Sequence, residues 1–177
     1  MIGRLRGEVA EKTAEGVVLD VGGVGYEVRC PLTVLDRLPR VSQACTLAIH
    51  THVREDQITL FGFHDDEERR LFRLLIGVSG IGPRLALACL SGLDAEAFAA
   101  AVANEDVRRL SSIPGIGKRT AERVVLELKE KIGRLPGRPA TGGSPALADL
   151  ESALGNLGYR PKEVEQLVAA LGPQAAQ

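Results

Sequence analysis

The sequence predicts an α+β protein in which a small β-barrel precedes an all-α region and a last small helical domain follows on a flexible linker. Two changes along the chain predict this order. At residue 65, short glycine-punctuated runs of Val, Ile and Leu give way to apolar residues at helical spacing. In the segment 136–145, six of ten residues are Pro or Gly, which is typical of a linker. We therefore expect domains at 1–64, 65–134 and 147–177, joined after 134 by a linker at 135–146.

The first 64 residues are expected to form five strands and one short helix. A run of glycines at 22–25, interrupted only by Val24, predicts a turn, because glycine adopts positive φ without steric cost. Leu32–Leu38 has helical spacing and is bracketed by Pro31 and Pro39. Five strands with a helix between the third and fourth fit a closed barrel of the OB type, and a sandwich with an unseen partner sheet is the alternative. The expected strands are 2–9, 16–21, 25–30, 45–53 and 57–63.

The chain is expected to be helical from residue 65 to about 132. Asp65 and Glu68 have the spacing of a capping box at the start of a helix. Asp94 and Asn104 stand where the N-caps of later helices are expected. Two further short helical stretches are expected within 147–171.

Composition excludes several classes of protein. Of 177 residues, 45% are apolar and 25% are charged, so the chain is not wholly disordered. No apolar run approaches the roughly 18 residues of a membrane span, and no secretory signal is visible. We therefore expect a cytoplasmic protein that does not associate with a membrane. Cys30, Cys45 and Cys89 lack any C-x-x-C spacing, and we expect small core residues rather than disulfides or metal ligands. Six aromatic residues, none of them Trp, argue against a base-stacking surface.

The net charge of −1 conceals an uneven distribution. Residues 1–68 hold seven Lys/Arg against twelve Asp/Glu, whereas residues 69–134 hold twelve Lys/Arg against seven Asp/Glu. The middle of the chain is therefore a basic module, which favours a polyanionic partner.

The basic module contains an internal repeat of 35 residues. Val78–Ala86 and Ile113–Ala121 share the pattern apolar-x-Gly-Ile-Gly-x-basic-x-Ala. One copy would be explained as a helix C-cap, but two copies in register, each followed by cations, favour a pair of anion-binding turns at helix N-termini. The inferred ligand is the phosphate backbone of duplex DNA, contacted without base specificity. The expected phosphate-binding residues are Gly80, Gly82, Arg84, Gly115, Gly117, Lys118, Arg119 and Arg123.

The paired turns resemble the helix-hairpin-helix motif, and the whole arrangement is similar to the RuvA family, the Holliday-junction-binding subunits of the bacterial RuvAB branch-migration complex. The other matching segments are 1–7, 22–26, 53–56 and 60–63. The resemblance implies structure-specific binding of four-way DNA junctions in recombination, repair and the SOS response. It implies a homotetramer of OB-like domains, either alone or as an octamer of two face-to-face tetramers. It also implies that the third domain docks the RuvB motor ATPase, and it makes the RuvC resolvase a candidate partner. The family's third domain usually has a third helix, which 171–177 does not predict, so we expect a shortened domain.

An adjacent acidic pair, Glu55 and Asp56, lies at a predicted turn between two strands. The pair could be a polar hairpin tip or two of the ligands of a nuclease metal. The resemblance implies a third role, an acidic pin whose carboxylates repel phosphates at the crossover and help to hold the strands apart.

We expect a non-catalytic DNA-binding subunit without cofactor or metal. The sequence has no Walker A pattern, so ATP hydrolysis is assigned to the RuvB partner. His50 and His52 alternate on one predicted strand, which is a weak indication of a metal site. The alternatives are a helix-hairpin-helix repair enzyme, either a glycosylase/lyase or a structure-specific nuclease, and a structural adaptor with no role on DNA. A glycosylase would need a nucleophile beside the turn and an aromatic wedge, neither of which the sequence shows.

Overall fold

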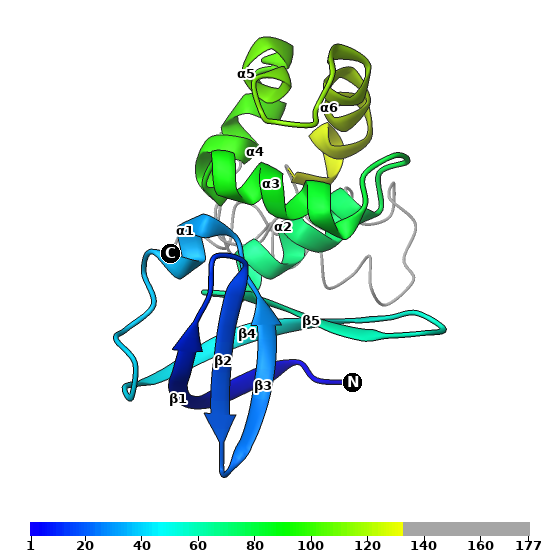
Figure 1. Ribbon diagram of the computed structural model, residues 1–177. Coiled ribbons are helices and arrows are strands. Elements are labelled where there is room, and N and C mark those ends of the chain that lie inside the picture. Colours follow the sequence, from blue (N-terminus) through cyan, green and yellow to red (C-terminus); the bar gives the residue numbers. More distant parts are fainter. Residues whose placement is uncertain (133–177) are drawn as a thin grey trace, which may run out of the picture. The chain divides into compact units, whose positions relative to one another are not determined.

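The structure, a computed structural model, describes residues 1–132 (Figure 1). Within these residues, five strands close into a barrel in the order β1-β2-β3-β5-β4. All neighbours are antiparallel except β3 and β5, which pair in parallel and complete the closure. The OB-like barrel is therefore confirmed and the sandwich is excluded. The strands are β1 (Arg4–Lys12), β2 (Gly16–Val21), β3 (Val24–Arg29), β4 (Ala44–Val53) and β5 (Ile58–Phe63).

The barrel core consists of the inward-facing residues of the alternating strand pattern. Val9, Leu19, Val28, Leu47 and Ile49 are each fully buried within it. Alternate residues of a strand point to opposite faces, so the polar residues between them remain exposed. This alternation explains why a chain with many acids in its first third still folds into a barrel.

The short helix of the barrel, α1 (Leu32–Leu35), ends earlier than the expected 32–38. Beyond Leu35 the backbone continues through tight turns, in which the amides of Arg37 and Leu38 donate to carbonyls three residues back. These turns bring Leu38 into the barrel core, where it is buried. The apolar spacing over 32–38, which predicted one helix, therefore belongs to a short helix followed by turns.

As far as residue 132, five helices follow the barrel: α2 (Asp66–Ile76), α3 (Pro83–Gly92), α4 (Ala95–Ala103), α5 (Val107–Ser111) and α6 (Lys118–Ile132). The carboxylate of Asp65 accepts from the Glu68 amide at 2.8 Å, and the Glu68 carboxylate accepts from the His64 amide at 2.9 Å, which makes a variant of the capping box. Asp94 caps α4 as expected, accepting from the Ala97 amide at 2.7 Å.

The expected N-cap at Asn104 is wrong. Asn104 is the C-cap of α4, and the next helix is capped by Asp106, whose carboxylate accepts from the Arg109 amide at 3.0 Å. Glu105 between them adopts a positive φ of 54°, which breaks the helical path before α5 begins. Asn104 and Asp106 have similar capping chemistry, so the sequence alone could not show which of them begins the next helix.

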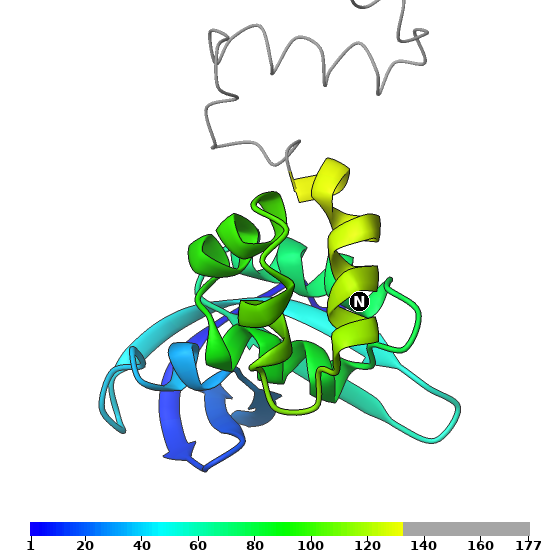
Figure 2. The same ribbon diagram turned by 90° about the horizontal axis from the view of Figure 1, so that it is seen from above.

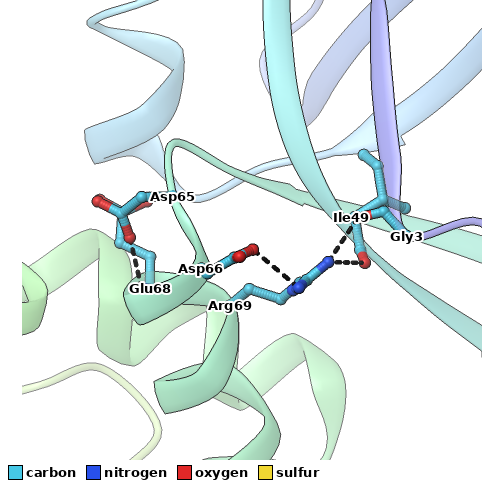
Figure 3. A network of polar contacts seen from close by, with 6 residues as sticks. All are labelled: Gly3, Ile49, Asp65, Asp66, Glu68 and Arg69. Carbon is cyan, nitrogen blue, oxygen red and sulfur yellow. Dashed lines mark hydrogen bonds and ion pairs between the residues drawn. The ribbon is translucent and has the colours of Figure 1, made fainter. Parts of the chain in front are cut away.

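Polar contacts join the barrel to the first two long helices. The Arg69 guanidinium on α2 forms an ion pair with Asp66 at 2.8 Å and donates to the backbone carbonyls of Gly3 and Ile49 in the barrel (Figure 3). On α3, the Ser91 hydroxyl accepts from the Leu32 amide at 3.0 Å. The helices α2 and α3 are therefore held directly against the barrel, as Figure 1 shows.

The expected linker at 135–146 and helical domain at 147–177 lie outside the described residues. Between residues 1 and 132, no single helix has the length and apolar composition needed to cross a membrane. The pair α3 and α4, bent by 95°, meets those criteria only when the two are taken together.

Candidate nucleic-acid interface

The two Gly-Ile-Gly turns have the same backbone structure. Gly80 and Gly115 adopt φ of 90° and 89°. In each turn the isoleucine amide donates at 3.0 Å to the carbonyl three residues back, from Ile81 to Val78 and from Ile116 to Ile113. The structure therefore confirms that the sequence repeat is a repeat of conformation. A side chain at either positive-φ glycine would be strained.

The second glycine of each turn leaves open space at the start of the following helix. A Cβ placed on Gly82 or Gly117 would meet no protein heavy atom within 4 Å, and both residues are exposed. An anion can therefore approach the first backbone N–H groups of α3 and α6, which have no partner within their own helix.

Buried apolar residues fix each turn between its helices. Ile81 and Ile116, at the centres of the turns, are 3% and 4% exposed. Ala86 and Ala121, one turn into the following helices, are completely buried. The small alanine side chains let the helices pack closely, so each turn sits on a buried apolar base.

Exposed cations follow both turns. Arg84 lies in the first turn of α3, and Lys118 and Arg119 begin α6. Lys118 is 3.9 Å from Glu122, but with their side chains 81% and 52% exposed this is a weak surface pair that leaves the ammonium accessible. These three positions have the exposure expected of phosphate-binding residues.

Arg123 has a further contact that sequence reasoning missed. Its Nη1 donates to the Ser79 carbonyl in the first turn at 2.9 Å, although it belongs to the helix after the second turn. A reciprocal contact comes from Leu85 of α3, the helix after the first turn, which reaches the second turn. Its Cδ1 is 2.9 Å from the position that a Cβ on Gly115 would occupy. Each turn is thus contacted by the helix that follows the other turn. No spacing rule predicts a hydrogen bond between residues 44 positions apart.

The acidic pair lies at the tip of the β4–β5 hairpin. Val53 and Ile58 are the last paired residues, and the Arg54 amide donates to the Gln57 carbonyl at 2.9 Å to close the turn that carries Glu55 and Asp56. All four turn residues are exposed. In Figures 1 and 2 the hairpin projects beyond both the barrel and the helices. The hairpin therefore presents the two carboxylates at an exposed tip.

Histidines and cysteines occupy packed surroundings. The His50 ring lies 5.4 Å from Phe72 and 6.4 Å from Phe61, between centroids, with His52 6.2 Å away. In residues 1–132, no cluster of three or more His, Cys, Asp or Glu side chains could hold a metal ion. Burial raises the pKa of Cys30 and of Cys89 to about 12, so both thiols stay protonated and pack as small apolar groups.

Comparison with known proteins identifies the family. A model of the RuvA N-terminal domain matches residues 1–62, a model of a SAM-like tandem helix-hairpin-helix matches 72–130, and a model of the RuvA C-terminal domain matches 145–176. Curated relatives are described as Holliday junction branch migration complex subunit RuvA. The relative from Chromobacterium violaceum is 50% identical over 177 residues, covering 97% of this chain and 90% of its own.

Two other relatives with the same description agree. The relative from Methylibium petroleiphilum is 51% identical over 174 residues, covering 97% of this chain and 90% of its own. The relative from Pseudomonas putida is 45% identical over 187 residues, covering 99% of this chain and 91% of its own. With a closed barrel, a tandem hairpin module and matches along nearly its whole length, the chain belongs to the RuvA family.

Proposed function

We propose that the protein binds four-way DNA junctions by their structure and acts as a subunit of a branch-migration complex. The observation that carries the proposal is the pair of identically folded turns at Gly80 and Gly115, each with an open approach to a helix N-terminus and exposed cations beside it. Two such sites in one compact unit suit two phosphates of a duplex arm. Contacts of this kind to the DNA backbone are independent of base sequence. The curated relatives are described as subunits of a Holliday junction branch migration complex, which agrees with this proposal.

The proposed phosphate-binding residues are the eight expected from the repeat. Gly82 and Gly117 contribute open backbone, and Gly80 and Gly115 supply the positive-φ turns. Arg84, Lys118 and Arg119 contribute exposed charge. Arg123 adds its contact with the Ser79 carbonyl. A guanidinium has five N–H groups, so this contact leaves donors for a phosphate. The sites require no metal and no cofactor, and we assign ATP hydrolysis to the RuvB partner.

The acidic pair fits a tetramer in which four copies surround the crossover. Glu55 and Asp56 project from the barrel on a hairpin whose flanking side chains, Val53 and Ile58, are 66% and 70% exposed. Carboxylates near converging phosphates raise the energy of close approach, more so where water is partly excluded. The pair would therefore keep the exchanging strands apart. We assign docking of RuvB to residues 147–177.

Electrophoretic mobility shift with a four-way junction, linear duplex and single strand of matched sequence tests the main proposal. We expect tighter binding to the junction than to the other two, and intact DNA after incubation with Mg²⁺. Equal affinity for junction and duplex would contradict the proposed function, and cleavage would favour a nuclease. Light scattering of the complex would test the tetramer.

The acidic pair is tested by Glu55→Gln with Asp56→Asn, which keeps size and removes charge. We expect junction affinity to hold or tighten and the preference for junction over duplex to shrink. Lys at both positions should enlarge the effect, because repulsion becomes attraction. Weaker junction binding after neutralisation would contradict the pin, since loss of negative charge near DNA does not weaken binding by direct electrostatics. No change would leave a polar tip.

Docking of RuvB is tested by ending the chain near Gly137. The shortened chain should bind junctions with unchanged affinity and fail to stimulate the motor. Stimulation by the shortened chain would place the docking surface within the remaining residues.

A further inference from the structure

Arg69 lies where the strand that carries the acidic hairpin meets the helix that leads to the first Gly-Ile-Gly turn. The strand, β4, runs without interruption to Val53 at the base of the hairpin tip, and the helix, α2, ends at Ile76, just before the turn that begins at Val78. Nη1 of Arg69 donates to the backbone carbonyl of Ile49 on β4 at 3.3 Å. One side chain therefore joins the two elements that position the acidic pair and the first phosphate-binding turn.

The same guanidinium also holds the segment before β1. Its Nη1 donates to the Gly3 carbonyl, which accepts from the Ile49 amide as well at 2.9 Å. Its Nη2 is paired with the Asp66 carboxylate at 2.8 Å (Figure 3). The N–H groups of a guanidinium form a fixed planar fork. Acceptors on two segments of the barrel and on α2 itself therefore fix the direction of the helix as well as its distance from the barrel.

Apolar packing also holds α2 against the barrel, but it sets the orientation of the helix less sharply. Phe72 of α2 is completely buried, with its ring centroid 5.0 Å from that of Phe61 and 4.9 Å from that of Phe63, both on β5. Hydrophobic burial has no preferred direction, whereas a hydrogen bond weakens steeply as its angle changes. Loss of the Arg69 guanidinium should therefore leave α2 packed on the barrel but less precisely oriented.

The next residue of α2, Arg70, has none of these contacts with the barrel. It is exposed, and within residues 1–132 it takes part in no ion pair, whereas the Arg69 side chain is only 18% exposed. Successive residues of a helix point roughly 100° apart, so the two arginines face different surroundings. Arg70 therefore offers the same charge on the same helix without the connection to β4.

We propose that Arg69 is a positioning residue for junction recognition, which sets the separation between the acidic pair and the first Gly-Ile-Gly turn. This inference rests on the proposed function. A junction held by the turns meets Glu55 and Asp56 at the crossover only if the hairpin lies at the right distance and angle from them. A linear duplex needs the turns alone. Arg69 acts through the protein, because its terminal nitrogens donate to the barrel carbonyls and to Asp66.

Arg69→Gln in the full chain tests the proposal, with Arg70→Gln as the matched control. We expect Arg69→Gln to leave affinity for linear duplex unchanged at equal salt, because both turns are intact. The preference for junction over duplex should fall about five-fold, which corresponds to about 1 kcal/mol. Arg70→Gln should leave this preference unchanged. A smaller folded fraction would weaken binding to both DNAs equally, so the ratio of the two affinities separates positioning from stability.

A double-mutant cycle then connects Arg69 with the acidic pair. Neutralising the pair by Glu55→Gln with Asp56→Asn should change the junction preference less in the Arg69→Gln protein than in the parent, because the pair is no longer held in place. Additive effects would overturn the proposal, as would no effect of neutralisation in the parent. Equal weakening of junction and duplex by Arg69→Gln, or an unchanged preference, would also overturn it. Failure of the parent protein to prefer junctions would instead refute the proposed function.

Discussion

The two Gly-Ile-Gly turns share a backbone but differ in chemistry and in attachment. The first is followed by Pro83, which has no N–H, and by one cation, Arg84, whereas the second is followed by Lys118 and Arg119. The first turn also lies between α2 and α3, the helices that hydrogen-bond to the barrel through Arg69 and through Ser91. The difference suggests a division of tasks. The second turn supplies more charge and one more backbone donor, and the first sets where the DNA lies relative to the barrel.

The largest expected effect comes from adding a Cβ to each turn. Gly80→Ala and Gly115→Ala both place an L side chain at φ near 90°, which costs roughly 1–3 kcal/mol of unfolding free energy. Gly115→Ala should cost more, because its Cβ would stand 2.9 Å from Leu85 Cδ1, whereas Cβ at Gly80 meets only the flexible Arg123 end at 3.7 Å. Chemical denaturation of the parent and of both variants measures the loss of unfolding free energy.

The control for this prediction removes the neighbour. Combining Gly115→Ala with Leu85→Ala should relieve the close contact and leave only the backbone strain, so the coupling between the two changes should be favourable. Equal destabilisation by the two glycine changes would show that the turns are packed alike.

The next effect concerns charge. The slope of log K against log salt for junction binding is negative, and lost contacts make it shallower. Lys118→Ala with Arg119→Ala should reduce its magnitude by about 1.8, and Arg84→Ala by about 0.9. Arg40→Ala, an exposed barrel residue, is the matched control and should leave the slope unchanged. Equal slopes for all variants would remove the phosphate assignment from both turns.

A smaller effect should separate charge from position at Arg123. Arg123→Lys keeps the charge but replaces the planar guanidinium that donates to the Ser79 carbonyl. We expect the salt slope of junction binding to stay constant while the free energy of unfolding falls by about 1 kcal/mol, the usual net contribution of one intramolecular hydrogen bond. Arg123→Ala should lower both. If Lys behaved like the parent in both measurements, Arg123 would act through charge alone.

Much of the fold could be predicted because it rests on local patterns. Alternating apolar residues and glycine turns located five strands to within about two residues at most ends. The helix starts at Asp65 and Asp94 followed from capping chemistry, and the repeat around Ile81 and Ile116 predicted two equal turns. Each of these features depends on residues within a few positions of one another.

The features that escaped prediction depend on contacts between distant residues. The hydrogen bond from Arg123 to Ser79 requires the two hairpins to pack together. A groove that Arg29 and Arg84 help to line requires the barrel to pack against α3. The break after Asn104 depends on where one residue, Glu105, adopts positive φ. Sequence periodicity contains none of this information, because it describes one element at a time.

The smallest expected effect is a dependence on pH at the contact that attaches the first turn to the barrel. His50 of β4 packs against Phe72 of α2, and its Nε2 is buried without a hydrogen-bond partner in residues 1–132. Burial, with help from the nearby charges of Arg73, His52 and Arg69, lowers the pKa of His50 below its ordinary value of 6.5. The unfolded chain therefore takes up this proton at a higher pH than the folded chain does.

It follows that the free energy of unfolding should fall as pH decreases through 6.5, and that this loss should be complete once pH is below the lowered pKa in the folded protein. His50→Gln cannot take up the proton, so it should lose less stability than the parent between pH 7.5 and pH 5.5. Urea denaturation of both proteins at the two pH values measures the difference, because contributions from the other titrating groups are common to both. Equal losses would show that protonation of His50 does not weaken the contact between β4 and α2. A smaller loss in the parent would mean that the charged imidazole is favoured there, contrary to its packing against Phe72.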